Sequence, residues 1–302
     1  TAYKVNNDDT YAAFHSLHYC MHECDWNFFP DLNKILLQGS HSPLDVPPLT
    51  LLALTDDPEL HHNCVRAHGR EVMKCVEETR DFDRTPVKGR KIKIGYFSND
   101  FYDHATMHLL GRFFELQNRD KFEVQIFDFG TAKENDIRKR LSEIADRYHN
   151  VKDLNDVELA GLARDEGLDI AVDLKGHTKG SRLAAFGYRA APVQVSFLGY
   201  PASTGLQTMD YFIADKVTVP EEMCRFFSEK LLYMPHCYQP NDRWRSELPE
   251  PPSRATLGLP EEGFVFCSLN NPNKITPQEF DVWMPLLQAV ENSVLWLLAP
   301  DD

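Results

Sequence analysis

From residue 91 onward, short runs rich in β-branched and aromatic residues alternate with segments of helical periodicity. This alternation constrains the fold most, because strands separated by helices need crossover connections, which favour a parallel sheet with helices on both faces. We expect an α/β fold with strands at 91–97, 122–129, 168–174, 193–197 and 211–214, and helices at 106–117, 135–148 and 157–166.

The sequence divides into four predicted segments. Residues 1–85 read as a helical segment and residues 86–238 as a first Rossmann-like domain. Residues 239–260 are rich in Pro, Glu and Arg and are predicted to be a linker, because the prolines prevent regular structure. Residues 261–302 have a strand–helix–strand pattern and are predicted to begin a second Rossmann-like domain. Because the first residue is not Met and the last strand ends near the terminus, we expect a fragment with an incomplete second domain.

Composition narrows the possible partners. A formal net charge of −14 would repel a polyanion, and the basic run at 88–93 leads directly into a strand, so we expect no nucleic-acid partner. The sequence contains neither a run of about eighteen apolar residues nor a secretion signal, so we expect a cytoplasmic protein with no membrane partner. Its seven cysteines are an odd number in a long chain and are predicted to be reduced thiols.

One cluster near the N-terminus contains metal-type ligands at short spacing: His15, His18, Cys20, His22 and Cys24. On a helix, the pair His18 and His22 lies on one face and the pair Cys20 and Cys24 on another, so the two pairs cannot easily converge on one ion. We therefore expect no metal site.

Ligands of open parallel sheets bind beyond the carboxyl ends of the strands, where loops and helix N-termini meet. Four polar loops follow predicted strands, at 98–108, 175–180, 198–205 and 270–277. In the first, His104 could act on or orient a hydroxyl group, and the alternative is that it packs a strand-to-helix corner. Neither a Gly-x-Gly-x-x-Gly nor a phosphate-loop motif occurs, which argues against a dehydrogenase and a phosphate-loop NTPase.

Lys274 has the clearest local signal. Thr276 suits a helix N-cap, Pro277 suits the first helical position, and Glu279 completes a capping box. Lys274 therefore precedes a helix N-terminus, where backbone N–H groups and the helix dipole favour an anion such as a diphosphate. From these residues alone, an ordinary surface lysine is the simpler interpretation.

Several ordered segments resemble the protein O-linked N-acetylglucosamine transferase family, which includes the plant SPINDLY branch. They are residues 92–108, 176–180, 198–215, 228–236 and 270–277, with Cys24-Asp25-Trp26 in the helical segment. The resemblance implies a GT-B-type fold of two facing Rossmann-like domains. It also implies preceding tetratricopeptide repeats, through which a homo-oligomer could form.

The activity that this resemblance implies is inverting, metal-independent transfer of a sugar from UDP-N-acetylglucosamine to Ser or Thr hydroxyls of an acceptor protein. The nucleotide sugar is a co-substrate, and no cofactor is expected. GDP-fucose is the alternative donor, because Gly176-His177-Thr178 and residues 270–277 look closer to the SPINDLY branch. A non-catalytic binding module is another alternative, because family members complete the nucleotide site with loops that this sequence lacks. We expect little or no turnover by this chain alone.

Residue roles follow from the same resemblance. His104 matches a family histidine beside the donor sugar and is the expected catalytic residue. Asn271 stands where animal enzymes have a nucleotide-contacting glutamine, and Lys274 matches their diphosphate-contacting lysine. The expected nucleotide-sugar-binding set is Asn271, Lys274, Gly199, Tyr200, Pro201, His177 and Thr178. The sequence departs from the animal enzymes at Arg164, where they have a histidine once considered catalytic, so that role does not transfer.

Overall fold

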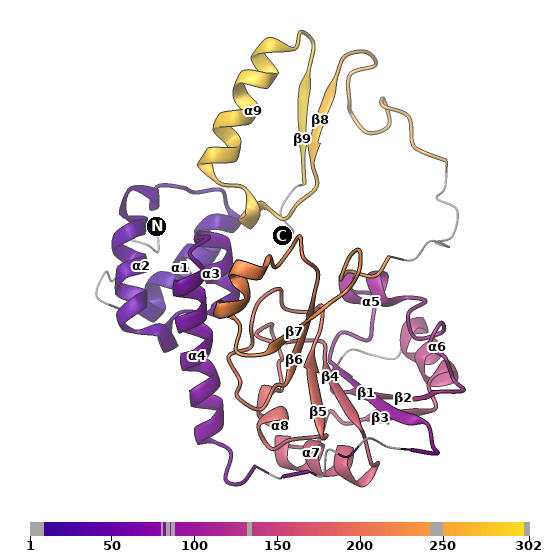
Figure 1. Cartoon of the computed structure of the whole chain (residues 1–302). Helices are drawn as coiled ribbons and strands as arrows, with labels where there is room; N and C mark the ends of the chain where they lie inside the picture. Colours follow the sequence, from indigo (N-terminus) through magenta and orange to yellow (C-terminus); the bar gives the residue numbers. More distant parts are fainter. Residues whose placement is uncertain are drawn as a thin grey trace. The chain divides into compact units, whose positions relative to one another are not determined.

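The computed structural model describes residues 9–79, 81, 82, 85, 88–131, 135–241 and 250–298. The chain divides into two compact units (Figure 1). Residues 57–244 form one, the large unit, and residues 1–56 together with 245–302 form the other, the small unit. The four predicted segment boundaries stay a prediction.

The large unit is built on a seven-stranded sheet in the order β3-β2-β1-β4-β5-β6-β7. Every pairing between neighbouring strands is parallel, as the predicted crossover connections require. The strands are β1 Ile92–Ser98, β2 Phe122–Asp128, β3 Arg147–Asn150, β4 Ile170–Asp173, β5 Val193–Ser196, β6 Tyr211–Ala214 and β7 Lys230–Tyr233. The predicted α/β fold with a parallel sheet is confirmed.

Helices cover both faces of this sheet (Figure 1). They are α4 Pro58–Lys74, α5 Ala105–Leu110, α6 Asp136–Ile144, α7 Asp156–Asp165, α8 Leu183–Gly187 and the short 3-10 helix η4 Glu221–Phe226. Side chains of α5 and α6 join one apolar cluster with the sheet, and side chains of α7 and α8 join the other. The end of α4 packs on this second cluster through Val72 and Met73.

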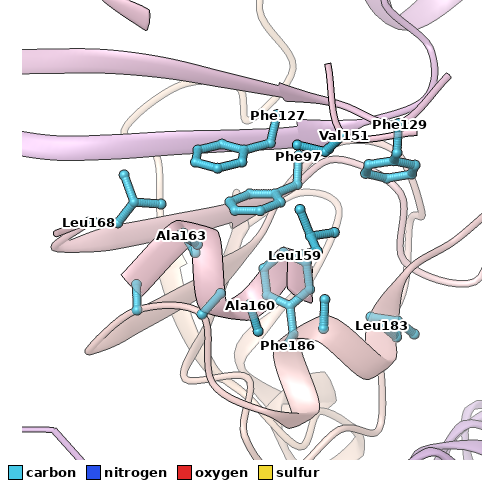
Figure 2. Close-up of a cluster of buried hydrophobic side chains, with 14 of the residues drawn as sticks. Phe97, Phe127, Phe129, Val151, Leu159, Ala160, Ala163, Leu168, Leu183 and Phe186 are labelled. Atoms are coloured by element: carbon cyan, nitrogen blue, oxygen red, sulfur yellow. The ribbon is translucent and has the colours of Figure 1, made fainter. Parts of the chain in front are cut away.

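The two clusters follow from the alternation of side chains along each strand. In β1, Tyr96 belongs to the cluster under α5 and α6, whereas Phe97 belongs to the other. The Phe97 ring stacks on that of Phe127 in β2, with 4.4 Å between the ring centroids. Figure 2 shows these two rings on the side of the sheet from which Leu159 and Phe186 approach. Burying each such side chain stabilises the fold by about 1.5–3 kcal/mol.

Both edge strands differ from the sequence-based expectation. The predicted helix 135–148 ends earlier, because α6 stops at Ile144 and residues 147–150 form β3. The strand β7 was not predicted. Both β3 and β7 have half-exposed or exposed side chains throughout, so they lack the apolar run that marks a central strand. They are strands because their backbones pair with β2 and β6, and a local sequence pattern does not reveal such pairing.

The small unit combines helices with a two-stranded parallel sheet, β8 Val265–Ser268 and β9 Val294–Leu297. Its helices are α1 Thr10–His22, η2 Phe29–Asp31, α2 Leu32–His41, η3 Pro43–Asp45, α3 Pro48–Leu54, η5 Pro272–Lys274 and α9 Pro277–Ala289. The crossover from β8 to β9 contains η5 and α9, which makes this a strand–helix–strand unit as predicted. Within the described residues, no helix is long and apolar enough to cross a membrane.

Candidate functional site

The strand order of the large unit identifies a switch point between β1 and β4. From β1 the chain proceeds outward to β2 and β3, whereas β4 to β7 fill the opposite side of the sheet. Ligands of open parallel sheets bind outside the carboxyl ends of the strands at such a point, because neighbouring loops diverge there. The residues that follow β1 and β4 are therefore the first candidates for a site.

A buried ion pair joins these two loops. Lys175 Nζ, after β4, lies 2.6 Å from Asp100 Oδ2, after β1, and their side chains are only 4% and 7% exposed. The backbone N–H of Asp100 also donates to Ser98 Oγ at 3.0 Å. Because each charge is buried, each depends on the other for compensation. The pair thus holds the two loops together at the switch point.

Asp173, the last residue of β4, shapes the second loop. Its carboxylate accepts hydrogen bonds from the backbone N–H of Lys175 at 3.0 Å and of Gly176 at 2.8 Å. Burial raises the pKa of the Asp173 carboxyl to about 6, although these two bonds oppose the shift. Gly176 has φ +51°, and a Cβ there would lie 2.4 Å from Tyr200 Cβ. The turn after β4 therefore requires both the carboxylate and the glycine.

His104 is the N-cap of α5. Its backbone is extended, and its Nδ1 accepts a hydrogen bond from the backbone N–H of Thr106 at 3.2 Å. Histidine is an uncommon N-cap, but its Nδ1 performs the same function as a capping side-chain oxygen. The sequence did not reveal this role, because His is not among the usual capping residues.

This cap determines which nitrogen of His104 can carry a proton in the neutral ring. A backbone amide can only donate, so Nδ1 is the acceptor and Nε2 carries the hydrogen. The carboxylate oxygen Oδ2 of Asp100 is 3.8 Å from Nδ1 and is already paired with Lys175. His104 therefore presents an N–H donor and is not part of a His–Asp pair like that of a general base.

His177 and Thr178 mainly bond within the fold. His177 Nε2 lies 2.7 Å from the carbonyl oxygen of Thr204, so Nε2 is the donor. Burial lowers the pKa of His177 to about 4, and the neighbouring His68 acts in the same direction. Thr178 Oγ1 donates to the carbonyl oxygen of Lys175 at 2.9 Å. Their role in binding a nucleotide sugar stays a prediction.

Two of the predicted residues after β5, Gly199 and Tyr200, serve in close packing. A Cβ at Gly199 would lie 1.8 Å from the Leu174 carbonyl oxygen, so only glycine fits beside the end of β4. Tyr200 is buried, and burial raises the pKa of its hydroxyl. Pro201 is exposed. Leu198 has φ +69°, a left-handed conformation that is costly for a branched side chain.

A second buried carboxylate supports the adjacent loop. Glu229 accepts hydrogen bonds from Ser203 Oγ at 2.6 Å and from the Thr204 backbone N–H at 2.7 Å, and it also bonds to the Thr204 hydroxyl. The sequence does not mark Glu229, Asp100 or Lys175 as paired residues, because no local pattern identifies a residue whose partner is distant in the chain.

In the small unit, Lys274 lies in the loop that follows β8. The capping box is present: the Thr276 backbone N–H donates to Glu279 Oε2 at 3.0 Å, and Pro277 is the first residue of α9. The bond with the Thr276 hydroxyl holds the pKa of Glu279 below its usual value. Lys274 is exposed, and no hydrogen bond or ion pair joins its ammonium group to another described residue. Lys274 therefore has the accessibility that an anion-binding residue needs.

Asn271, the other predicted residue of this loop, caps η5. Its Oδ1 accepts from the Asn273 backbone N–H at 3.3 Å, and its side chain is exposed. The structure thus divides the predicted residues between the two units. Asn271 and Lys274 belong to the small unit, and the large unit contains His104, His177, Thr178, Gly199, Tyr200 and Pro201.

Arg164, where the resemblance fails, has a structural role. Its Nη1 donates to the carbonyl oxygens of Tyr188 and Arg189 at 3.1 and 3.2 Å. In the part of the chain that the structure describes, no group of three or more His, Cys, Asp or Glu side chains has a metal-binding arrangement. Metal independence nevertheless stays a prediction.

Comparisons with known proteins now place the chain in a class. The sequence profile of glycosyl transferase family 41 matches residues 69–249 and 250–300. The chain therefore belongs to glycosyl transferase family 41, which confirms the family that the sequence motifs predicted. A mutant O-GlcNAc transferase of Thermobaculum terrenum has a similar structure, with a TM-score of 0.76 and 26% sequence identity over 96% of this chain and 55% of that one. This similarity supports the predicted GT-B-type fold class.

Individual relatives come from plants and animals. A probable UDP-N-acetylglucosamine–peptide N-acetylglucosaminyltransferase SEC of Arabidopsis thaliana is 34% identical over 69% of this chain. A probable transferase named SPINDLY of Solanum lycopersicum is 30% identical over 76% of it. A UDP-N-acetylglucosamine–peptide N-acetylglucosaminyltransferase of Caenorhabditis elegans is 35% identical over 52% of it. The chain spans only 22%, 25% and 14% of the lengths of these three relatives.

Proposed function

We propose that this chain is part of a protein glycosyltransferase that transfers a sugar from a nucleotide-sugar donor to Ser or Thr hydroxyls of an acceptor protein. The observation that carries the proposal is the match of glycosyl transferase family 41 across segments of both units. The exposed Lys274 before α9 and the polar switch point of the large unit support it.

Lys274 is proposed to stabilise the departing nucleoside diphosphate. Negative charge accumulates on the leaving phosphate as the acceptor hydroxyl attacks the anomeric carbon from the opposite face. An exposed ammonium group beside the N-terminus of the 13-residue helix α9 can compensate this charge. Glu279 bonds to Thr276 at the same helix end, so its carboxylate lowers the local attraction for an anion. The full charge of Lys274 is therefore needed in addition to the helix dipole.

His104 is proposed to orient the sugar or the acceptor hydroxyl. Its Nε2–H can donate to an oxygen, whereas its Nδ1 is occupied by the cap of α5. The proton of the acceptor hydroxyl must then pass to another group, such as an oxygen of the departing phosphate. The proposal contains no step on a metal ion, and metal independence is part of what is proposed.

UDP-N-acetylglucosamine is the proposed donor. The names of the SEC, SPINDLY and Caenorhabditis elegans relatives all refer to this donor, which supports the proposal. The alternative, GDP-fucose, predicts a different mass for the product. Mass spectrometry of acceptor proteins after co-expression with the gene product that contains this chain separates the two: a hexosamine-type increment supports the proposal, and a deoxyhexose increment replaces it with the alternative.

Lys274→Ala in that gene product tests the leaving-group role. We expect a decrease in the transfer rate on the order of 10²–10³-fold, because one preorganised charge partner of the transition state is removed. Lys34→Ala is the matched control, because Lys34 is another exposed lysine of the small unit. Wild-type rates in Lys274→Ala, or an equal loss in both variants, would contradict the assignment.

A further inference from the structure

Trp26 connects the N-terminal helices of the small unit to the loop that carries Lys274. Its indole Nε1–H donates to the carbonyl oxygen of Ile275 at 3.1 Å, across 249 positions of the sequence. Its ring also contacts the ring of Phe280, in the first turn of α9, with 5.4 Å between centroids. Trp26 therefore touches the chain on both sides of Thr276, where the loop enters the helix.

The end of α1 sets the position of Trp26. Cys24 has φ +50°. Its backbone N–H donates to the carbonyl oxygen of Met21, and the backbone N–H of Asp25 donates to the carbonyl oxygen of Cys20 at 2.8 Å. These bonds form a Schellman-type helix end, in which the residue after the cap adopts the left-handed conformation. Asp25 Oδ1 then accepts from the backbone and side-chain N–H groups of Asn27. Hydrogen bonds before and after Trp26 thus fix the backbone of the turn that contains it.

The loop itself is seated on these helices. Ile275 is only 3% exposed, Pro272 is buried, and η5 packs against α1. Lys274, between these two anchored residues, is exposed. The backbone of the loop is therefore held by the N-terminal helices, while the Lys274 ammonium group extends into solvent.

We infer that Trp26 is a positioning residue for the nucleotide-binding loop 270–276, so that the N-terminal helices act as part of the donor site. This inference rests on the proposed function of Lys274. The geometry gives the reason: the Trp26 bond holds the peptide group between Ile275 and Thr276, one residue beyond Lys274, and a small displacement of an ion-pairing group lowers its contribution to a charged transition state. None of the family motifs assigns this task to Trp26.

Hydrogen exchange of the loop tests the structural half of the inference. The backbone amides of Lys274 and Ile275 donate to the carbonyl oxygens of Asn271 and Pro272. In Trp26→Phe, which keeps one aromatic ring for Phe280 and removes the indole N–H donor together with the second ring, we expect these two amides to exchange about three- to tenfold faster than in the wild-type chain. The amides of β8 should keep their wild-type rates.

Trp296→Phe provides the matched control, because it makes the same substitution in β9 of the same unit. We expect it to leave the Lys274 and Ile275 amides unchanged. Wild-type exchange in Trp26→Phe would overturn the inference. An equal acceleration of the loop and β8 amides would also overturn it, because Trp26 would then support the whole unit and not this loop.

Donor kinetics test the functional half. In the gene product that contains this chain, with UDP-N-acetylglucosamine and GDP-fucose each tried as donor, Trp26→Phe should lower kcat about three- to tenfold and leave the acceptor KM unchanged, because a displaced Lys274 stabilises the transition state less. An unchanged kcat would overturn the inference. If Lys274→Ala also left transfer unchanged, the proposed function would fail with it, whereas the exchange experiment would still report whether Trp26 holds the loop.

Discussion

The charged groups at the strand ends of the two units differ in how they are used. In the large unit, Asp100 and Lys175 neutralise each other in a buried pair, and Asp173 and Glu229 accept hydrogen bonds from neighbouring loop residues. In the small unit, Lys274 is exposed and no other described residue pairs with it. The large unit thus uses its charges for folding, while the small unit leaves one available for a ligand.

This difference separates stability from activity. A buried charge contributes to function only through the loop conformation that it maintains, because its partner already satisfies it. An exposed charge contributes little to stability, because water solvates it equally well in the folded and unfolded chain. Substitutions in the two units should therefore affect different measurements.

The largest expected effect comes from Lys175→Met in the large unit. This change leaves the buried Asp100 carboxylate without its partner, so the free energy of unfolding should fall by about 3–5 kcal/mol. Lys274→Met makes the same substitution at an exposed position and should leave the unfolding free energy unchanged. Denaturant titration of both variants measures the contrast, and equal stabilities would break the comparison between the units.

The next effect concerns the acid response of the large unit. Burial lowers the pKa of His177 from 6.5 to about 4, so between these pH values the unfolded chain binds a proton that the folded chain does not. The contribution of His177 to the free energy of unfolding is therefore fully present above pH 6.5. It decreases as the pH falls from 6.5 to about 4, by at most about 3 kcal/mol. His177→Gln retains a donor for the Thr204 carbonyl oxygen and should remove this component.

Titration of Asp173 changes the free energy of unfolding in the opposite direction. The informative quantity is therefore the difference in unfolding free energy between the wild-type chain and His177→Gln. The pKa of Asp173 is raised to about 6, and its contribution to stability therefore increases as the pH falls from 6 toward 3.8. Unfolding of wild type and His177→Gln, measured at several pH values, cancels this shared component. A constant difference across the range would show that His177 does not titrate as described.

His104 allows the two functions of one side chain to be separated. Asn at this position can still cap α5 but lacks a donor at the place of Nε2, whereas Gln offers an amide N–H near that place and loses the cap. If His104 is a donor, His104→Asn should lower transfer by about 10²-fold. His104→Gln should retain more activity and lose about 1 kcal/mol of stability.

The contrary outcome is equally specific. A general base cannot be replaced by either amide, so equal inactivity of His104→Asn and His104→Gln would contradict the donor role. Transfer rates of both variants, together with their unfolding free energies, distinguish these outcomes. The result would also show whether the large unit contributes a group to chemistry beyond the buried pairs that maintain its loops.

The smallest effect is expected at Cys24 in the small unit. A non-glycine residue at φ +50° is strained, and Gly in that conformation relieves the strain. Cys24→Gly should therefore raise the unfolding free energy by up to about 1 kcal/mol. Cys24→Ala keeps the Cβ and serves as the control; an equal gain in both variants would assign the effect to the thiol instead of the backbone.

Local signals in the sequence were sufficient for a large part of this architecture. The central strands were predictable because their apolar runs are buried on both faces of a parallel sheet. The capping box at Thr276 and Glu279 was predictable because both partners are three residues apart. The edge strands β3 and β7 were not, because partial exposure removes the apolar signal.

By itself, the sequence determined the α/β class, the family and the helix start beside Lys274, since each depends on residues that are neighbours in the chain. Only the tertiary structure decided that Asp100 pairs with Lys175, that Nδ1 of His104 is occupied, and that Trp26 supports the loop after β8. The Asp100–Lys175 pair and the Trp26 contact share one physical reason. Their partners are 75 and 249 positions apart in the sequence, and folding alone brings such residues together.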